Sequence, residues 1–433
     1  METFFIQNFG CRATQADGAA IESSLLSKGL ESVGREAADV VILNTCTVTS
    51  AADEDVRHTI NRVRRENPLA RILVTGCYAQ RAPAELAALP GVTWVVGNSH
   101  KTEIYEIVVA ESGTPYHGQI HVGDIFTQQE FLAGVVEDAS GDRTRPNLKI
   151  QDGCGNRCSF CVIPYVRGRS RSAQPDWVVA QVRNLAERYR EVVLSGINLG
   201  RWGRDLGGKL RLADIVRRLL EETAVERLRL SSVEPMDFSD DLLGLMASSP
   251  RIARHVHAPL QSGSDSVLRR MHRKYRPRHY EDRILKARAL MPEAAIGADV
   301  MTGFPGETEA EFEENRRFIA GLPFTYLHVF TYSERPGTPA AAEAVQVPVP
   351  VRKERNRVLR ELAAAKNLEF RQQMVGRTLS VVTLEQEGMG LSSNYVKVEL
   401  AAGRAANRIV EVAIGGVTVG GVSEVPQSAL AVA

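Results

Sequence analysis

Three cysteines lie within eight residues of the segment QDGCGNRCSFC, and their thiolates could hold a metal centre. No histidine is nearby, and structural zinc sites usually use four ligands. A [4Fe–4S] cluster is usually held by four cysteines, so three would leave one iron open. The CxxxCxxC spacing therefore predicts an iron–sulfur centre, with a zinc site as the alternative. The three residues are Cys154, Cys158 and Cys161.

The other three of the six cysteines are far apart, yet each follows a short apolar run. The runs TFFIQNFGC, ADVVILNTC and ARILVTGC end at Cys11, Cys46 and Cys77, with amphipathic stretches between them. This alternation predicts βαβ units and a parallel sheet, whose strand carboxyl ends share one edge. We therefore expect these cysteines to converge at that edge. Buried structural cysteines are the alternative.

Six further apolar runs lie between residues 148 and 338, and a helical pattern follows most of them. They read LKIQDGC, EVVLSGIN, RLRLSSVEP, HVHAPLQSG, AIGADVMTGFPGE and YLHVFTYSERPGT. Six βα units predict an open or partial barrel with its site at the strand carboxyl ends. GFPGET lacks the GK[ST] ending of a phosphate loop, so we interpret it as a turn and helix N-cap. The expected strand-end residues are Cys154, Gly196, Glu234, Gln261, Asp299 and Tyr332.

A proline-rich break, PGTPAAAEAVQVPVPV, and a charged helical segment precede a change of character near residue 371. Beyond it, Val, Ile and Gly alternate in several short runs, which predicts a small antiparallel β-barrel. The predicted fold class is α/β, with an N-terminal parallel sheet domain, a central partial (β/α)6 barrel and this C-terminal barrel. The expected domains span residues 1–130, 140–370 and 371–433.

The CxxxCxxC spacing at the end of a first strand resembles the signature of radical S-adenosylmethionine enzymes. The resemblance implies that the open iron binds S-adenosylmethionine, whose cleavage yields a 5′-deoxyadenosyl radical. Polar and glycine residues at the strand ends, and a basic residue after the cysteines, are then candidate cofactor contacts. For each of them, an ordinary hydrogen-bonded loop residue is the alternative. The candidates are Ser195, Gly196, Glu234, Gln261, Ser262, Asp299 and Arg167.

Over nearly its whole length the chain resembles the methylthiotransferase family. The resemblance implies that Cys11, Cys46 and Cys77 hold a second [4Fe–4S] cluster that carries sulfur, and that the last barrel is a TRAM-like RNA-binding domain. One S-adenosylmethionine then serves as methyl donor and another as radical source, because side chains cannot supply a radical. One position departs from the family, which usually has Asn where this chain has Thr14.

Three segments, TGCYAQ, SGINLGRWG and RLSSVEP, resemble the branch that modifies C2 of N6-threonylcarbamoyladenosine at position 37 of the tRNA anticodon loop. The alternatives are the branches acting on isopentenyladenosine in tRNA or on a ribosomal-protein aspartate, and a non-catalytic metal-binding RNA adaptor. The expected partners are tRNA, an electron donor such as flavodoxin or ferredoxin, and a sulfur donor.

The most basic segment, LRRMHRKYRPRHYEDR, mixes basic and aromatic side chains, which suits phosphate contact and base stacking. A solvated helix face with charge partners is the alternative. The formal net charge is only +1, so RNA contact must come from local patches. Because the last barrel is charge-balanced, an aromatic side chain is the candidate there. The candidate contacts are Arg269, Arg270, Arg273, Lys274, Tyr275, Arg276 and Tyr395.

No apolar run is long enough to span a bilayer, and METFFIQNFGC lacks the pattern of a secretory signal. We therefore expect a cytoplasmic protein with no membrane partner. In that compartment disulfides are disfavoured, and clustered cysteines more often bind metals or take part in catalysis.

Overall fold

The computed structural model describes residues 3–110, 118–128, 131, 144–401 and 403–425. The chain forms two compact units. The expected boundaries at residues 130 and 140 lie outside the described residues. The segment with Cys154, Cys158 and Cys161 belongs to the same unit as the N-terminal cysteines. Unit 1 comprises Met1–Gly141, Lys149–Ala173 and Ser333–Ala341, and unit 2 comprises Asp142–Leu148, Gln174–Tyr332 and Ala342–Ala433.

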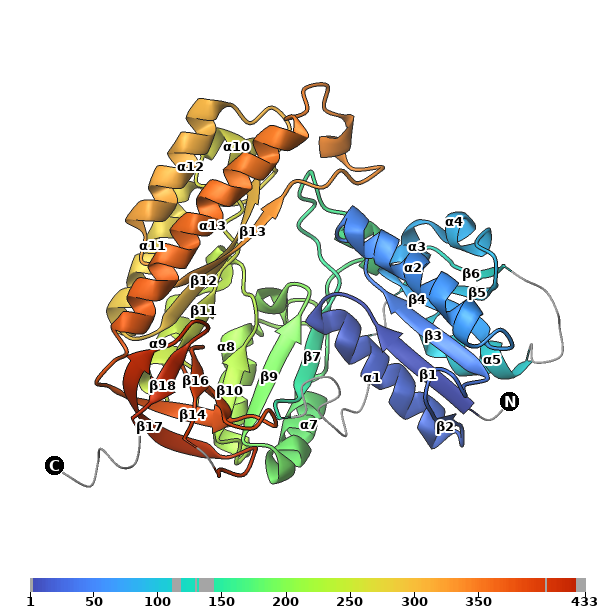
Figure 1. Ribbon diagram of the computed structural model, residues 1–433, viewed down its shortest axis with the longest axis horizontal. Helices are drawn as coiled ribbons and strands as arrows, with labels where there is room; N and C mark the ends of the chain where they lie inside the picture. Colours follow the sequence, from blue (N-terminus) through green and yellow to red (C-terminus); the bar gives the residue numbers. More distant parts are fainter. Residues whose placement is uncertain (1–2, 111–117, 129–130, 132–143, 402, 426–433) are drawn as a thin grey trace. The chain divides into compact units, whose positions relative to one another are not determined.

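Unit 1 is built on a six-stranded sheet in the order β2-β1-β3-β4-β5-β6, with every neighbouring pair parallel (Figure 1). Strands β3, β4 and β5 are apolar and almost wholly buried, as expected for a sheet covered on both faces. The predicted parallel α/β domain is thus confirmed. The strands are β1 (Thr3–Asn8), β2 (Glu31–Ser32), β3 (Val40–Thr45), β4 (Arg71–Gly76), β5 (Val92–Gly97) and β6 (Gln119–His121).

Helices cover both faces of this sheet, because successive strand residues point to opposite sides. Val41 and Leu43 pack with Ile60 of α2, whereas Val40 and Ile42 pack with α1 and α5. Each helix therefore buries one apolar stripe and leaves its polar side to solvent. The helices are α1 (Arg12–Ser27), α2 (Ser50–Glu66), α3 (Cys77–Arg81), α4 (Pro83–Ala87) and α5 (Ile104–Ala110), with the 3₁₀ turn η1 (Lys101–Glu103).

The second part of unit 1 carries the short cysteine cluster between paired strands. β7 pairs antiparallel with β8, and the cysteine loop and α6 lie between them in sequence. The segment Ser333–Ala341 joins the unit: Ser333 Oγ lies 3.1 Å from Ser50 Oγ, and the Ala340 amide donates to the Ser159 carbonyl at 2.9 Å. The elements are β7 (Asn147–Asp152), α6 (Ile163–Arg167) and β8 (Arg171–Ser172).

The central strands form two sheets, in the orders β10-β9-β7-β8 and β11-β12-β13. In unit 2, β9 pairs parallel with β10, and β12 pairs parallel with both its neighbours. A bridge between Leu228 and Ile252 and a hydrogen bond from the Val233 amide to the His257 carbonyl connect β10 with β11. The expected series of βα units is confirmed. The strands are β9 (Glu191–Gly196), β10 (Arg227–Leu230), β11 (His255–His257), β12 (Ala295–Thr302) and β13 (Tyr326–Thr331).

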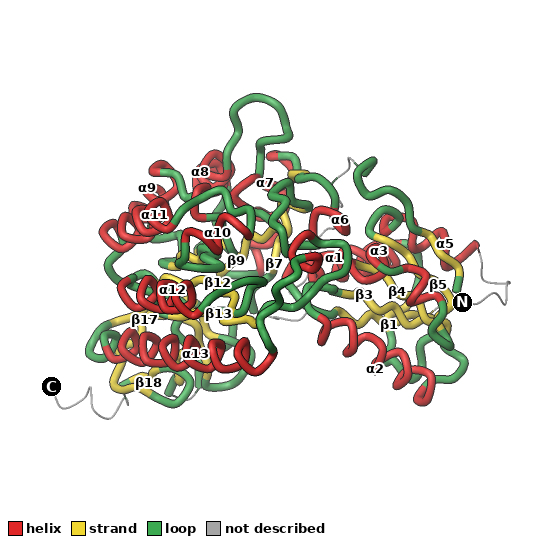
Figure 2. Tube along the Cα trace, turned by 90° about the horizontal axis from the view of Figure 1, so that it is seen from above, coloured by secondary structure: helices red, strands yellow, loops and turns green. Residues whose placement is uncertain are grey.

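The helices of unit 2 lie outside these strands (Figure 2). Residues 303–308 form the predicted turn and N-cap, because Thr308 and Glu311 exchange side-chain-to-backbone hydrogen bonds at the start of α12. Such a cap stabilises a helix by about 1 kcal/mol. The elements are η2 (Leu199–Arg201), α7 (Pro175–Arg188), α8 (Leu212–Glu222), η3 (Pro235–Asp237), α9 (Asp240–Ser248), α10 (Asp265–Arg270), α11 (Pro277–Leu290), α12 (Glu309–Gly321), η4 (Pro339–Ala342, mostly in unit 1) and α13 (Val349–Gln372).

The C-terminal residues form a closed barrel in the order β14-β15-β16-β18-β17. The neighbouring pairs are antiparallel as expected, with one exception: β16 and β18 are parallel. A closed ring of five strands cannot alternate direction at every pair, so one parallel pair is unavoidable. Val381, Val398 and Val412 fill the barrel, together with Phe370 and Met374. The strands are β14 (Thr378–Thr383), β15 (Met389–Ser392), β16 (Lys397–Glu399), β17 (Ile409–Val417) and β18 (Val422–Glu424).

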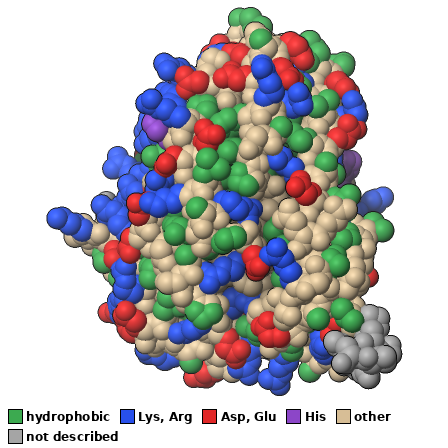
Figure 3. Space-filling view, turned by 90° about the vertical axis from the view of Figure 1, so that its left-hand side faces the viewer, with side chains coloured by type: hydrophobic (Ala, Val, Ile, Leu, Met, Phe, Trp, Pro, Cys, Tyr) green, Lys and Arg blue, Asp and Glu red, His purple; other side chains and the backbone are tan. Residues whose placement is uncertain are grey.

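The surface carries both signs of charge, as the net charge of +1 predicts. On the face drawn in Figure 3, Lys and Arg side chains alternate with Asp and Glu. Within the described ranges, no helix is long and apolar enough to cross a membrane.

Candidate metal and cofactor site

The three N-terminal cysteines lie just beyond the carboxyl ends of adjacent strands. Cys11 precedes the first residue of α1, Cys46 directly follows β3, and Cys77 opens α3 directly after β4. Because β1, β3 and β4 are neighbours in the sheet, these residues share one edge. Gly10 has a φ of 91°, and a Cβ built there would lie 2.8 Å from Cys46 Sγ. Only glycine allows this close approach.

The electrostatics of Cys46 show that the three thiols are near neighbours. Burial, with smaller contributions from Cys77 and Cys11, raises the pKa of the Cys46 thiol to about 12. A thiolate is the form that binds metal, so this site needs positive charge to hold one. Thr14 contributes a hydroxyl 3.5 Å from Cys11 Sγ. The departure from the family's Asn therefore keeps a polar group beside this sulfur.

The spacing of the cysteines bears on what kind of metal centre they could hold. Among residues 3–110, 118–128, 131, 144–401 and 403–425, no three His, Cys, Asp or Glu side chains converge closely enough to hold one metal ion. In a [4Fe–4S] cluster each thiolate binds a different iron, so the sulfurs stand apart. Three mutually interacting thiols at one sheet edge therefore fit a cluster.

The second set, Cys154, Cys158 and Cys161, lies on the loop between β7 and α6. Gly153 has a φ of 69°, and a Cβ built there would lie 2.0 Å from a carbonyl oxygen. The Cys154 amide donates to the Gly168 carbonyl at 3.0 Å. The backbone thus fixes where this loop begins and ends, and the three thiols lie within one short, folded segment.

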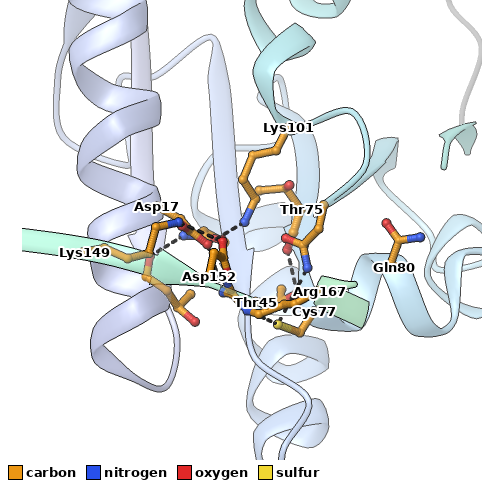
Figure 4. Close-up of polar contacts among 12 residues, drawn as sticks. Asp17, Thr45, Thr75, Cys77, Gln80, Lys101, Lys149, Asp152 and Arg167 are labelled. Carbon is orange, nitrogen blue, oxygen red and sulfur yellow. Dashed lines mark hydrogen bonds and ion pairs between the residues drawn. The ribbon is translucent and has the colours of Figure 1, made fainter. Parts of the chain in front are cut away.

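Arg167, predicted to contact a cofactor carboxylate or phosphate, is buried in unit 1, where its nitrogens contact protein groups. Its Nε donates to Cys77 Sγ at 3.2 Å, and its terminal nitrogens lie 2.9 Å from Asp17 and Asp152 (Figure 4). Burial lowers the pKa of Arg167, but Cys77, Asp17 and Asp152 together raise it well above its ordinary value. Asp17 is 150 residues away in sequence, so no local pattern signals this contact.

A second ion-pair cluster supports the segments that carry Cys46 and Cys77. Asp53 accepts from Arg335 at 2.7 Å, from Arg81 at 3.0 Å and from the Thr47 hydroxyl at 2.7 Å. Thr47 directly follows Cys46, and Arg81 ends α3, the helix that Cys77 opens. Sequence reasoning missed these residues, because their partners come from separate segments.

The polar strand-end residues of unit 2 offer unpaired atoms to a ligand. Gly196 is the last residue of β9, and the preceding Ser195 is buried. Within the described residues, Ser195 Oγ and Ser231 Oγ are buried and have no hydrogen-bond partner. Buried hydroxyls normally have one, so both fit contact with a polar ligand. Ser231 follows β10, and sequence reasoning did not single it out.

The two candidate carboxylates of unit 2 each have a basic neighbour. Glu234 pairs with Arg273 at 2.5 Å, and Asp299 Oδ1 lies 3.2 Å from His257 Nε2. Burial raises the pKa of Glu234, although Arg273 opposes the change. Asp299 lies within β12 and not at its end, which differs from the expectation. His257 on β11 is a further residue of this site that the sequence did not reveal.

Gln261 and Ser262 lie on the loop after β11. Gln261 has a φ of 65°, in the left-handed region, and forms a bridge with Val300. Ser262 is fully buried, and its hydroxyl accepts from the Ser264 amide at 3.2 Å. Its hydroxyl thus accepts one bond inside the loop and keeps its own proton, and the predicted role at the methionyl end stays a prediction.

Burial removes two residues from the predicted RNA contacts. Tyr275 is 2% exposed, and its hydroxyl donates to the Leu260 carbonyl at 2.6 Å. Arg273 is 7% exposed beside Glu234. A ring in the core cannot stack on a base, and a buried, paired guanidinium does not face RNA, so these two predictions are corrected. Tyr275 holds the loop after β11, and Arg273 pairs with Glu234 on the loop after β10.

The remaining basic residues of this segment lie nearer the surface. Arg270 pairs with Glu311, while Arg269 and Arg276 both pair with Asp265. Lys274 is exposed. In the last barrel, Tyr395 is half-buried and stacks on His255 with a centroid distance of 4.4 Å.

Comparison with known proteins identifies the family. Residues 3–97 match the model described as Uncharacterized protein family UPF0004, and residues 148–319 match the Radical SAM superfamily. The chain is 37% identical to Threonylcarbamoyladenosine tRNA methylthiotransferase MtaB of Aquifex aeolicus, over 94% of this chain and 99% of the relative. It is 38% identical to the Bacillus subtilis protein of that name, over 92% and 90%. It is 34% identical to tRNA-2-methylthio-N(6)-dimethylallyladenosine synthase of Acidothermus cellulolyticus, over 89% and 78%.

Solved structures support the fold. The radical S-adenosylmethionine methyltransferase TsrM of Kitasatospora setae superimposes with a TM-score of 0.60 at 15% identity, covering 79% of this chain and 78% of that one. The radical enzyme OxsB reaches 0.54 at 10% identity, over 83% and 55%. Together with the sequence relatives, the cysteine loop defines a radical S-adenosylmethionine enzyme. The chain belongs to the tRNA methylthiotransferase family and uses S-adenosylmethionine and a [4Fe–4S] cluster.

Proposed function

We propose that this enzyme inserts a methylthio group at C2 of N6-threonylcarbamoyladenosine at position 37 of tRNA. The observation that carries the proposal is the match in length to relatives with that substrate in their name. The chain covers 99% of the Aquifex aeolicus relative and 90% of the Bacillus subtilis one. It covers 78% of the Acidothermus cellulolyticus dimethylallyladenosine synthase.

Two clusters serve this reaction in our proposal. Cys154, Cys158 and Cys161 would hold the cluster that binds S-adenosylmethionine, and Cys11, Cys46 and Cys77 would hold a second one. Three observations support the second cluster: the shared strand edge, the interacting thiols and the Arg167 guanidinium 3.2 Å from Cys77 Sγ. When bound, the clusters and S-adenosylmethionine supply the radical, the sulfur and the methyl group that side chains lack.

The chain's own residues orient the cofactor in this proposal. The buried hydroxyls of Ser195 and Ser231 would accept or donate hydrogen bonds to its polar atoms. The Glu234 carboxylate, oriented by Arg273, would take an ammonium or hydroxyl group, and His257 would orient Asp299 for the same purpose. The net change at the substrate replaces C2–H by C2–S–CH3.

Three partners complete the proposal. An electron donor such as flavodoxin or ferredoxin would reduce the first cluster, and a sulfur donor would renew the sulfur. The tRNA would contact exposed basic residues, including Arg269 and Lys274, and the C-terminal barrel as a TRAM-like domain. Lys274→Ala should weaken tRNA binding modestly and reduce its salt dependence, measured by titration at several salt concentrations.

Nucleoside mass spectrometry of tRNA from cells lacking the gene tests the substrate. The expected result is loss of 2-methylthio-N6-threonylcarbamoyladenosine and accumulation of the unmethylthiolated nucleoside. Complementation with the wild-type gene should restore the product, and a Cys154→Ala gene should not. An unchanged tRNA profile would overturn the proposal and direct attention to a ribosomal-protein aspartate.

A second candidate substrate is isopentenyladenosine in tRNA. It is favoured by the 34% identity to the Acidothermus cellulolyticus synthase. The same experiment distinguishes the two, because loss of the methylthio group from the isopentenyl nucleoside alone would select this second candidate.

A further inference from the structure

The ion pairs around Arg167 contain more cations than carboxylates. We define the Arg167 cluster as Asp17, Lys101, Lys149, Asp152 and Arg167. Their side chains are between 1% and 8% exposed. Lys101 lies 2.9 Å from Asp17, Lys149 lies 2.9 Å from Asp152 and also pairs with Asp17, and Arg167 contacts both carboxylates. Three cations thus face two carboxylates in a buried place.

The Cys77 sulfur is the acceptor in contact with this excess charge. Arg167 donates through Nε to Cys77 Sγ, while its other two nitrogens are held by Asp17 and Asp152 (Figure 4). An arginine keeps its charge in proteins, and a buried charge without a counter-charge is unfavourable. The Cys77 sulfur, 3.2 Å from Nε, is the acceptor that faces the third cation. The guanidinium also lies in the electrostatic range of Cys11.

The cluster joins the segments that carry the two cysteine sets. Asp17 lies on α1, six residues after Cys11, and Lys101 lies on η1. Asp152 ends β7, two residues before Cys154, and Arg167 ends α6, which follows the cysteine loop. Through its guanidinium, Arg167 therefore links the N-terminal domain to the residues before and after the loop that carries Cys154, Cys158 and Cys161.

We infer that Arg167 is a positioning residue for the N-terminal metal centre: it holds the Cys77 sulfur in place through a hydrogen bond and raises the reduction potential of the cluster there. This inference rests on the proposed second cluster. The potential of an iron–sulfur cluster depends on its net charge and on hydrogen bonds to its sulfurs. Arg167 acts on both, because it places a fixed positive charge and an N–H donor at one ligand sulfur.

The test uses the full chain with Cys154, Cys158 and Cys161 all changed to Ala, so that only the N-terminal cysteines can hold iron. After anaerobic reconstitution, iron is counted and the midpoint potential is measured by a redox titration followed by electron paramagnetic resonance. In this background Arg167→Gln should give a more negative midpoint potential. Arg167→Lys keeps the positive charge but loses the branched guanidinium. Its midpoint potential should therefore lie between that of the chain with Arg167 and that of the Arg167→Gln variant.

Arg171→Gln is the matched control. Arg171 is a buried cation of the same segment, 4.0 Å from Asp152, and it donates to the Gln128 carbonyl. Its removal should shift the potential less than the removal of Arg167. Equal shifts in the two Gln variants would overturn the inference.

Two further outcomes are distinguishable. If the triple-Ala background binds no iron, the second cluster is absent, and the proposed two-cluster function fails together with the inference. If iron binds normally and Arg167→Gln leaves the potential unchanged, only the inference fails. Circular dichroism shows whether Arg167→Gln folds. If it does not, the shifts of the midpoint potential in Arg167→Lys and Arg171→Lys are compared instead, and equal shifts would again overturn the inference.

Discussion

Two buried, cation-rich clusters differ in the acceptors that their arginines reach. In the Arg167 cluster of unit 1, the guanidinium contacts a thiol at 3.2 Å. In unit 2, Glu191 is surrounded by Arg229 at 2.7 Å, Arg227 at 3.3 Å and Arg145 at 3.6 Å. We call this second group the Glu191 cluster.

The arginines of the Glu191 cluster use their spare donors on the last barrel. Arg229 donates to the carbonyls of Ser392 and Ser393, and Arg227 donates to Ser380 Oγ at 2.8 Å. These acceptors are neutral parts of the protein, so the cluster holds β10 and the barrel together. A buried arginine thus holds two parts of the fold together where its acceptor is a carbonyl, and would serve the proposed second metal centre where its acceptor is a thiol.

The largest effect on activity is expected from removing the thiol that distinguishes the Arg167 cluster from the Glu191 cluster. We expect Cys77→Ala to abolish methylthio product while cleavage of S-adenosylmethionine persists, with iron falling from about eight to about four per chain. Iron analysis and product assays measure this. Ser380→Ala, which removes the corresponding acceptor in unit 2, should keep product and iron. Normal product formation by Cys77→Ala would contradict the assignment of the second cluster.

Removing one carboxylate tests whether the Arg167 cluster depends on charge balance. Asp17→Asn leaves three buried cations with only Asp152, so we expect the free energy of unfolding to fall by roughly 3–5 kcal/mol. Denaturant unfolding of the metal-free chain measures it. Asp265→Asn, on the exposed pair with Arg269, should cost about 1 kcal/mol or less. Equal losses in the free energy of unfolding for the two variants would show that burial does not strengthen the ion pairs of the Arg167 cluster.

Acid should weaken the Glu191 cluster within a defined range. Burial alone would raise the pKa of Glu191, but Arg229, Arg227 and Arg145 lower it to about 2, against 4.5 without these interactions. The folded-state pKa is depressed, so the contribution is complete above about pH 5 and is lost as the pH falls towards 2. The contribution of Glu191 to the free energy of unfolding is on the order of 3 kcal/mol. Unfolding measured from pH 7 to 2.5 should show it.

Glu191→Gln provides the control for that acid range. The variant should be less stable at neutral pH and should lose less of its remaining stability between pH 5 and 2.5. If wild type and variant show parallel pH profiles, Glu191 does not carry the acid dependence.

The smallest effect is expected for the acceptor in the barrel. Ser380→Ala removes one hydrogen bond from Arg227 and should lower the free energy of unfolding by about 1 kcal/mol. Chemical denaturation resolves such a change. A cost similar to that of Asp17→Asn would mean that the two clusters do not differ as proposed.

Local pattern was sufficient to predict the elements that carry the site. Apolar runs ending in cysteine predicted the strands before Cys46 and Cys77, because strand alternation and turn chemistry are local. The six βα units and the turn and helix N-cap at residues 303–308 were predicted for the same reason. The closed C-terminal barrel was also predicted, except for its one parallel pair.

Residues whose role depends on distant partners were not predictable. Arg167 and Arg273 both lie in basic stretches that suggested phosphate or RNA contact, yet Asp17 and Glu234 hold them inside. A sequence shows a charge but not the segment that neutralises it. Tyr275 was misjudged similarly, because only the fold shows that its hydroxyl meets the Leu260 carbonyl.

The segment Ser333–Ala341 has a consequence for how the protein is made. Asp53 meets Arg335, which lies 282 residues later in the chain. At a synthesis rate of about 5–20 residues per second, roughly 15–55 s pass between the two. The N-terminal sheet therefore leaves the ribosome well before its last ion pair can form. All six cysteines belong to this late-completed unit. If both sets bind clusters as proposed, the incomplete unit would be accessible for a long interval during which iron and sulfur could be delivered.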